Sequence, residues 1–213
     1  MYIPRLNRMT DLDTMTAFMQ QHNFAIVVSA VNNIPVATHL PFTIARSENN
    51  LRLRSHFAKA NPQWQTIAES DTLVIFSGPH AYISPTHYDK TESVPTWNYI
   101  TVHAYGRASL VDFETQPDAL EAMIMEMVDV HEPNYRGQWN QLSQRYKDGM
   151  KQGVVGIEIE VTRLEGKAKL SQNKSATEQE RIADSLMHHS EGHVMQIGYA
   201  MMNTHQNPID NAH

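Results

Sequence analysis

Apolar and polar residues alternate along the segment VPTWNYITVHAYG, residues 94–106. Side chains of a strand point to its two faces in turn, so the odd-numbered positions share one face. That face carries Trp97, Tyr99, Thr101, His103 and Tyr105. The even-numbered positions from 100 to 104 are aliphatic or small. The pattern predicts a strand with one core face, whose other face either packs on a neighbouring sheet or offers an aromatic surface to a flat ligand.

The same β pattern recurs on both sides of this segment. Residues 24–44 hold two β-rich runs separated by Asn32 and Asn33, a pair typical of a hairpin turn. Residues 51–57 alternate, residues 72–78 are mostly apolar, and residues 154–166 place Val155, Ile157, Ile159 and Val161 on one face. Strands in series with helices inserted late argue against a βαβ repeat. We therefore expect a mainly β protein, a mostly antiparallel barrel with peripheral helices.

Helical periodicity marks the remaining segments. Amphipathic spacing predicts helices over residues 11–21, 114–132, 137–146 and 175–189, the last with a capping box of Ser175 and Glu178. Residues 80–97 and 167–174 are polar and read as loops, of which the first is long enough to suggest a functional role. We expect a single domain over residues 1–198, followed by a flexible tail over residues 199–213.

Composition and charge narrow the class of protein. The chain has 213 residues, no cysteine, and 17 Lys plus Arg against 23 Asp plus Glu, a formal net charge of −6. The lack of cysteine excludes disulfides, thiolate metal sites and thiol nucleophiles. No apolar stretch approaches the length of a membrane span, so we expect a soluble cytoplasmic protein without membrane contact. Direct DNA binding is not expected, because clustered Lys and Arg are missing.

One group of residues suggests anion binding. A strand and a short helix that begins at Asn61 and Pro62 are joined by a basic segment containing Arg54, Ser55, His56 and Lys59. A helix start with basic residues before it can hold a phosphate. Thr38 and His39, near the end of another predicted strand, would face the same space if the two strands pair. The alternative is a solvated surface turn.

Other chemistries find less support. The chain has 12 histidines, and His188, His189 and His193 lie close in sequence, but Gly192 interrupts their helical spacing and no metal-binding motif is present. Surface or capping histidines explain them better, and no metal site is expected. The chain has no nucleophile elbow of a serine hydrolase and no phosphate-binding loop of a nucleotide hydrolase.

Six short segments carry a resemblance to a known family. They are MYIP at the start, ATHLPF (37–42), HFAKANPQW (56–64), GPHAYISPTHY (78–88), VPTWNYITVHAYG (94–106) and GKAKLSQN (166–173). In this order they resemble the PaiB-like family of FMN-binding negative transcriptional regulators. That family is similar to the pyridoxamine-phosphate-oxidase-like proteins. The resemblance implies a six-stranded antiparallel split β-barrel that forms a homodimer and binds FMN between protomers.

The resemblance also implies a set of cofactor-binding residues. FMN has a dianionic phosphate, a polyhydroxyl chain and a flat ring, so its site needs cations at one end and stacking or amide partners at the other. Lys59 matches the position of a phosphate-binding lysine, assisted by Arg54, Ser55 and His56. The ribityl chain and ring edge would meet Thr38, His39 and Leu40. The ring would meet Trp97 and Asn98, together with Lys169, Ser171, Gln172 and Asn173, either from the same chain or from the partner subunit.

One departure from the family pattern bears on the ligand. Related barrels often place more arginines at the phosphate end, whereas His56 stands here where a firm cation would help. This predicts weak FMN binding, or a different ligand such as haem. Three functions stay open at this point: an FMN-binding regulator that affects transcription directly or indirectly, an FMN-dependent oxidoreductase whose chemistry comes mostly from the cofactor, and a haem-binding split barrel. No catalytic residue can be named.

Overall fold

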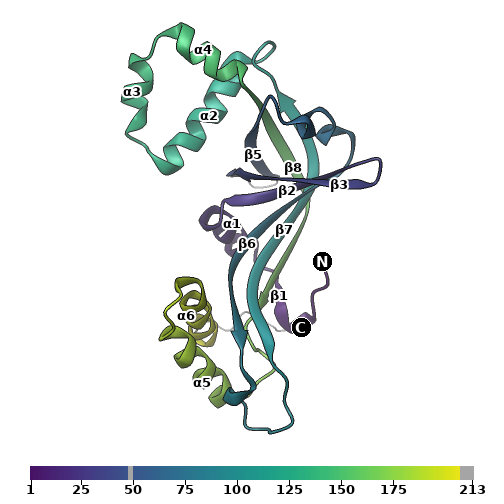
Figure 1. The fold of residues 1–213 in the computed structure, drawn as a ribbon, viewed down its shortest axis with the longest axis vertical. Coiled ribbons are helices and arrows are strands. Elements are labelled where there is room, and N and C mark those ends of the chain that lie inside the picture. Colours follow the sequence, from purple (N-terminus) through teal and green to yellow (C-terminus); the bar gives the residue numbers. More distant parts are fainter. Residues whose placement is uncertain (48–49, 207–213) are drawn as a thin grey trace. The chain divides into compact units, whose positions relative to one another are not determined.

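A computed structural model describes residues 1–47 and 50–206 of the chain. Figure 1 shows its helices and strands. The strands are β1 (Arg8–Met9), β2 (Phe24–Val31), β3 (Ile34–Pro41), β4 (Thr43–Ser47), β5 (Asn50–Ala58), β6 (Thr72–Ile83), β7 (Thr96–Val111) and β8 (Val154–Lys169). The helices are α1 (Leu12–Gln21), α2 (Pro117–His131), α3 (Tyr135–Gln141), α4 (Gln144–Gln152), α5 (Ala176–Met187) and α6 (Gly192–Gln206).

The predicted hairpin between residues 24 and 44 is confirmed. β2 and β3 pair antiparallel, and the turn residues Asn32 and Asn33 have φ angles of 51° and 64°. Two consecutive positive φ angles are typical of a type I′ turn, whose twist matches that of the strands. Asparagine tolerates this conformation better than most residues. The turn chemistry therefore fixes the register of this hairpin.

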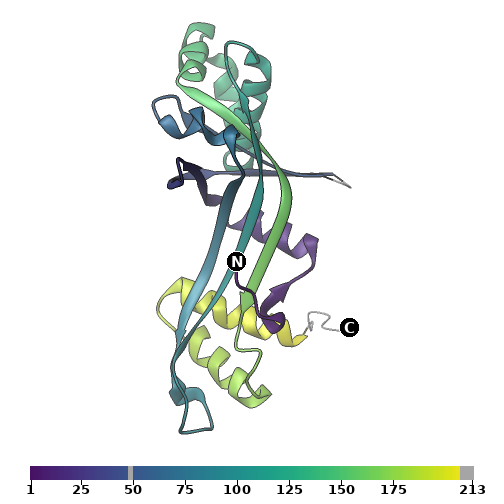
Figure 2. The same cartoon turned by 90° about the vertical axis from the view of Figure 1, so that its right-hand side faces the viewer.

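The strands form one mainly antiparallel sheet with helices around it, as the sequence predicts, but among the described residues the sheet is open and not closed into a barrel. Its order is β3-β2-β6-β7-β8-β5-β4, with β1 beside β8, and the long strands β6, β7 and β8 run side by side in Figures 1 and 2. Eight strands are present among the described residues, rather than the expected six. The two-residue β1 is too short to leave a sequence pattern. Phe42 lies between β3 and β4, and its N–H donates to the carbonyl oxygen of Asn23, the residue before β2, at 2.8 Å.

Two boundaries differ from the sequence-based expectation. The segment 137–146 is not one helix, because Ser143 caps a new helix: its hydroxyl accepts a hydrogen bond from the N–H of Tyr146. The loop expected over 80–97 is shorter, since β6 continues to Ile83 and β7 begins at Thr96. The residues that leave regular strand structure are therefore concentrated between 84 and 95.

The chain divides into two compact units. Unit 1 comprises Met1–Met15, Ser77–Val102 and the chain from Glu165 onward, and unit 2 comprises Thr16–Phe76 and His103–Leu164. The core of unit 2 contains Leu53, Phe57, Ile157 and Ile159, all fully buried, and an edge-on pair of Phe42 and Phe76. At Gly106 a Cβ atom would lie 2.0 Å from the carbonyl oxygen of Glu160, so only glycine allows β7 and β8 to approach this closely.

Helices α5 and α6 pack side by side in unit 1 (Figures 1 and 2). Ile182 and Ile197 are fully buried, and the capping box of Ser175 and Glu178 begins α5 as predicted. The chain remains helical to Gln206, past residue 198 where we expected a tail to begin, and Met201 is 1% exposed. Burial of this apolar side chain accounts for the helix, and residues 207–213 of the expected tail lie outside the described residues. No helix in the described ranges is long and apolar enough to cross a membrane.

Candidate functional site

The predicted cofactor residues fall into two groups, one in each unit. The first, called the β5 group, lies in unit 2 and comprises Thr38, His39, Leu40, Arg54, Ser55, His56 and Lys59. The second, called the β7 group, lies in unit 1 and comprises Trp97, Asn98, Lys169, Ser171, Gln172 and Asn173. Each group is described by itself.

Strand alternation divides the β5 group between two faces. Ser55 is fully buried and its hydroxyl donates to the carbonyl oxygen of Pro41 at 2.6 Å. Its neighbours Arg54 and His56 point to the opposite face, because successive side chains of a strand alternate. Ser55 therefore holds β5 against the end of β3.

Arg54 is held by two carboxylates. Its guanidinium donates to Glu158 at 2.7 Å and to Glu126 at 3.0 Å, and these hydrogen bonds raise the pKa of Arg54 above its usual value. Glu158 faces it from β8 and Glu126 from α2. A guanidinium paired in this way has fewer donors left for a ligand phosphate.

The Thr38 hydroxyl is also engaged within unit 2. It donates to the Gln63 side chain at 2.7 Å and accepts from the Asn61 side chain at 2.9 Å. Both partners belong to the short 3-10 helix Pro62–Gln65 and its cap, where Asn61 also accepts from the N–H of Gln63. Thr38 thus joins β3 to the segment after β5, which brings the two predicted strand ends together.

Lys59 is the least constrained cation of the β5 group. Its ammonium lies 3.8 Å from Asp112 and 4.0 Å from Glu114, both near the limit of an ion pair, and its side chain is 39% exposed. Such contacts contribute little to stability and leave the ammonium free to reorient. His39 is exposed and stacks on Phe24, and Leu40 is buried.

His56 lines an apolar cavity of about 260 Å³ together with residues of α2 and of the segment that follows it, through Tyr135. Its Nδ1 is buried and has no hydrogen-bond partner, and burial lowers the pKa of the imidazole. The ring is therefore neutral at pH 7. This agrees with the expectation from sequence that His56 does not supply a firm positive charge.

A buried pair forms the centre of the β7 group. The Asn98 side chain is fully buried and its amide nitrogen donates to the Ser171 hydroxyl at 2.9 Å, while that hydroxyl is placed to donate to the Asn98 side-chain oxygen Oδ1 at 3.2 Å. Ser171 is 3% exposed and has a φ of 63°, in the left-handed region that serine rarely adopts. Asn98 on β7 thus fixes the turn that follows β8.

Trp97 lies on the other face of β7 and is 53% exposed. Tyr82 contacts it edge-on with ring centres 5.9 Å apart, and His80 lies at the same distance. Further along this face, Lys167 lies over the Tyr99 ring at 5.0 Å. The opening segment has the predicted core face at Val102 and Ala104, which are fully buried, but Ile100 is only partly buried. Its other face carries aromatic rings with a basic neighbour, although Thr101 on that face is buried.

The remaining β7-group residues shape the turn after β8. The Gln172 side chain accepts from the N–H of Leu170 at 2.7 Å and donates to the carbonyl oxygen of Ala168 at 2.5 Å. The Lys169 ammonium donates to the Thr96 hydroxyl. Lys169, Ser171 and Asn173 line a cavity of about 810 Å³. Sequence reasoning missed two other lysines of this cavity, Lys90 and Lys174, because only folding brings their loops together.

The histidines near the C-terminal end are engaged locally. His188 Nδ1 lies 2.8 Å from the Asp184 carbonyl oxygen, His189 accepts from the N–H of Glu191 at 3.1 Å, and His193 lies 3.3 Å from the Glu191 carboxylate. Gly192 begins α6, so the predicted interruption of the helix is confirmed. Within residues 1–47 and 50–206, no three His, Asp or Glu side chains converge as metal ligands.

Two solved structures share this fold. The FAD and heme binding protein from Mycobacterium smegmatis matches with a TM-score of 0.60 and 14% identity, over 81% of this chain and 78% of that chain. The flavocytochrome Anf3 from Azotobacter vinelandii matches with a TM-score of 0.58 and 16% identity, over 76% and 68%. These two proteins therefore share the fold class of this chain, a mainly antiparallel β-sheet with peripheral helices.

Sequence comparison identifies the family. Residues 1–163 match the model of the family described as "Putative FMN-binding domain", and the chain belongs to that family. The "Protease synthase and sporulation protein PAI 2" of Bacillus subtilis (strain 168) is 36% identical over 202 residues, 94% of this chain and 96% of its own length. The matched residues include all of the β5 group as well as Trp97 and Asn98, and they end before Lys169.

Proposed function

We propose that this protein binds FMN and acts as a regulator of the PaiB-like type, with residues 1–198 forming a split-barrel domain of a homodimer. The observation that carries the proposal is the family match over residues 1–163. These residues contain the partly exposed Lys59 and the exposed Trp97, a cation and an aromatic ring of the kinds that FMN needs. The regulatory part is supported by the similarity to the PAI 2 protein, whose name refers to protease synthase and sporulation.

For the phosphate we propose Lys59 as the main contact. Its two carboxylate neighbours stand at 3.8 and 4.0 Å, so an incoming phosphate dianion competes with weak ion pairs only. In this proposal Arg54, Ser55 and His56 shape the phosphate end, and Thr38, His39 and Leu40 lie along the ribityl chain. A neutral His56 adds no charge, which predicts binding weaker than in a site with several cations.

For the ring we propose Trp97, because an exposed indole face is a suitable stacking partner for a flat tricyclic system. Asn98 is fully buried, so its proposed role is to position the turn through Ser171. Lys169, Gln172 and Asn173 complete this end of the proposed site. When bound, FMN would supply any redox chemistry, and the residues of the chain would bind and orient it.

The test is a titration of FMN with purified apo-protein, followed by quenching of flavin fluorescence, for wild type, Lys59→Ala and Trp97→Ala. We expect saturable binding that each substitution weakens about tenfold, since a charge-assisted hydrogen bond or a stacked ring contributes about 1–2 kcal/mol. Lys147→Ala removes a lysine that contacts Trp139 instead, and should leave the affinity unchanged. Absence of quenching at micromolar protein would overturn the proposal.

The same preparation separates the alternative functions. A flavin absorbance spectrum without a Soret band is expected of the purified protein, whereas a sharp Soret band would favour haem binding. Oxidation of NADH or NADPH that depends on added FMN would identify an oxidoreductase. The regulatory proposal expects no such turnover. It expects instead that FMN changes the association of the protein with a partner.

A further inference from the structure

Unit 1 contains a cavity that the proposed function does not explain in full. Its volume is about 810 Å³, within the usual range of pockets for nucleotide-sized ligands. One wall is the loop from Tyr88 to Thr96 and the other is the turn that follows β8. The lining residues are Tyr88, Lys90, Thr91, Glu92, Ser93, Val94, Pro95, Thr96, Lys169, Ser171, Asn173 and Lys174.

The charge of this lining is opposite to that of the whole chain. Three lysines line the cavity against one glutamate, a balance of two positive charges, whereas the chain carries a formal charge of −6. Lysines gathered in one cavity repel one another, and a bound anion would relieve this repulsion. The concentration of lysines here therefore points to an anionic ligand.

The three ammonium groups are held without a direct carboxylate partner in the described part of the chain. Lys169 donates to the Thr96 hydroxyl, and Lys174 lies over the Tyr88 ring at 3.4 Å from its centre. The Glu178 carboxylate accepts hydrogen bonds from the N–H groups of Asp89 and Ser175, which lower its pKa. The positive charge of Lys174 adds to this lowering, but Lys174 does not donate a hydrogen bond to Glu178. All three lysines can therefore donate to a ligand.

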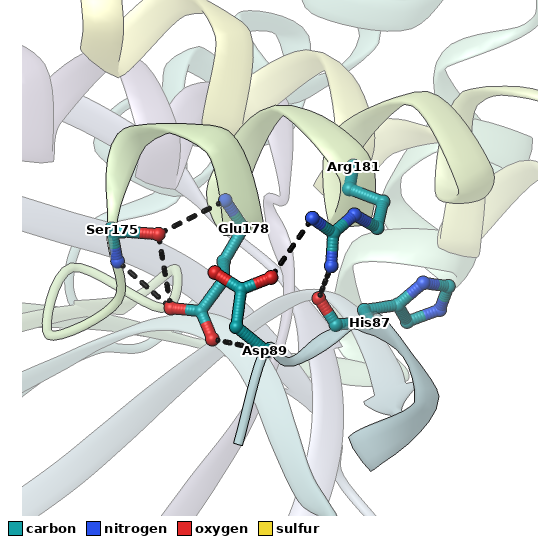
Figure 3. Close-up of polar contacts among 5 residues, drawn as sticks. All are labelled: His87, Asp89, Ser175, Glu178 and Arg181. Atoms are coloured by element: carbon teal, nitrogen blue, oxygen red, sulfur yellow. Dashed lines mark hydrogen bonds and ion pairs between the residues drawn. The ribbon is translucent and has the colours of Figure 1, made fainter. Parts of the chain in front are cut away.

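Hydrogen bonds and an ion pair join the loop that forms the first wall of the cavity to α5 (Figure 3). Arg181 donates to the carbonyl oxygen of His87 at 2.8 Å and to the Asp89 carboxylate at 3.0 Å. Glu178 accepts from the N–H of Asp89 at 3.0 Å with one oxygen and from Ser175 with the other. These contacts fix the backbone immediately before Lys90, so this side of the cavity is preorganised for a ligand.

The opposite wall holds an unfavourable backbone conformation. Ser171 has a φ of 63°, which costs a residue other than glycine or asparagine about 1–2 kcal/mol, and two hydrogen-bond contacts with Asn98 maintain it. The strained turn places Lys169, Asn173 and Lys174 along one cavity. Strain held by dedicated side chains is a common feature of ligand sites.

From the lysines, the fastened loop and the strained turn, we infer that this cavity binds a phosphate ester of nucleotide size through Lys90, Lys169 and Lys174. The lysines would bind the phosphate as point charges, and the hydroxyl and amide groups of Thr91, Ser93 and Asn173 would accept or donate hydrogen bonds to the remainder. The inference shares Lys169 and Asn173 with the proposed function and goes beyond it, because Lys90 and Lys174 have no role there.

The test uses the full-length protein and isothermal titration with ADP, inorganic pyrophosphate and adenosine, before and after loading with FMN. We expect saturable binding of ADP and pyrophosphate, and none of adenosine at the same concentrations. The double variant Lys90→Gln/Lys174→Gln should weaken ADP binding at least tenfold, because each lost charge-assisted contact accounts for about a tenfold change. The matched control Lys147→Gln should bind ADP as wild type does.

Two further measurements decide the source of the phosphate. If the double variant loses affinity for FMN but not for riboflavin, the lysines bind the phosphate of FMN. If ADP binds to the FMN-loaded protein, the lysines bind the phosphate of a second nucleotide. Either result supports the inference. Absence of ADP, pyrophosphate and FMN binding up to millimolar concentration overturns it, as does a double variant in which neither the ADP affinity nor the FMN affinity changes. If the wild-type protein binds ADP but does not bind FMN, only the proposed function is overturned.

Discussion

At the scale of single residues, Ser171 combines two features that can be separated by substitution. Its hydroxyl is the partner of the fully buried Asn98 amide, and its backbone has a φ of 63°. Ser171→Ala removes the partner and keeps the strain, so we expect a loss of about 1–3 kcal/mol in the free energy of unfolding. Urea denaturation followed by circular dichroism measures this change.

Ser171→Gly is the matched comparison. It removes the same hydroxyl, but glycine adopts positive φ without a steric cost, so this variant should be about 1 kcal/mol more stable than Ser171→Ala. Equal stability of the two variants would mean that the backbone at residue 171 is not strained. Because the turn borders the lysine cavity and the Asn98 contact holds it in place, Ser171→Ala should also weaken ADP binding.

At the scale of elements, the attachment of the 84–95 loop to α5 should depend on pH. Hydrogen bonds from the Asp89 and Ser175 N–H groups to the Glu178 carboxylate lower its pKa below the usual value of 4.5. A carboxyl whose pKa is lower in the folded state stabilises that state above its unfolded pKa, and this contribution is lost as the pH falls through the folded pKa. The attachment is therefore complete at pH 7 and weakens below about pH 4.5.

The corresponding measurement compares urea unfolding of wild type and Glu178→Gln between pH 7 and pH 3. We expect wild type to be the more stable at pH 7 and the difference to shrink as the pH is lowered. Glu180→Gln, an exposed position on the same helix, should follow the wild-type profile. A difference between wild type and Glu178→Gln that stays constant over this range would show that the Glu178 charge does not hold the loop.

The same elements show what the sequence could and could not predict. The Asn32-Asn33 turn and the capping box of α5 depend on neighbouring residues, and both are confirmed. The alternation of the opening segment is confirmed for residues 102–106, but Thr101 is buried and Ile100 is only partly buried. Lys90 and Lys174 come from loops far apart in the chain, so no local pattern connects them. The ion pairs of Arg54 depend on α2 and β8 in the same way. The proposed FMN contacts stay a prediction until the titration is done.

At the scale of the whole molecule, net charge bears on how a regulator could act. The formal charge of −6 repels a DNA backbone, and three lysines line the cavity of unit 1. Three lysines neutralise at most three phosphates, which predicts a loss of about 40-fold in DNA affinity when salt rises fourfold. Any contact of this surface with DNA would then be weak at physiological salt. The charge distribution therefore favours regulation through a protein partner or through a small ligand.

We accordingly expect that fluorescent DNA duplexes from the organism's own promoters are not retarded by micromolar protein in an electrophoretic mobility assay at 150 mM salt, with or without FMN. At 20 mM salt a diffuse shift is expected, because unscreened lysines attract any duplex, and the Lys90→Gln/Lys174→Gln variant should reduce it. A discrete complex that survives 150 mM salt and prefers one sequence would contradict this, since an acidic surface cannot supply such affinity through phosphate contacts alone. DNA binding would then have to come from contacts with the bases.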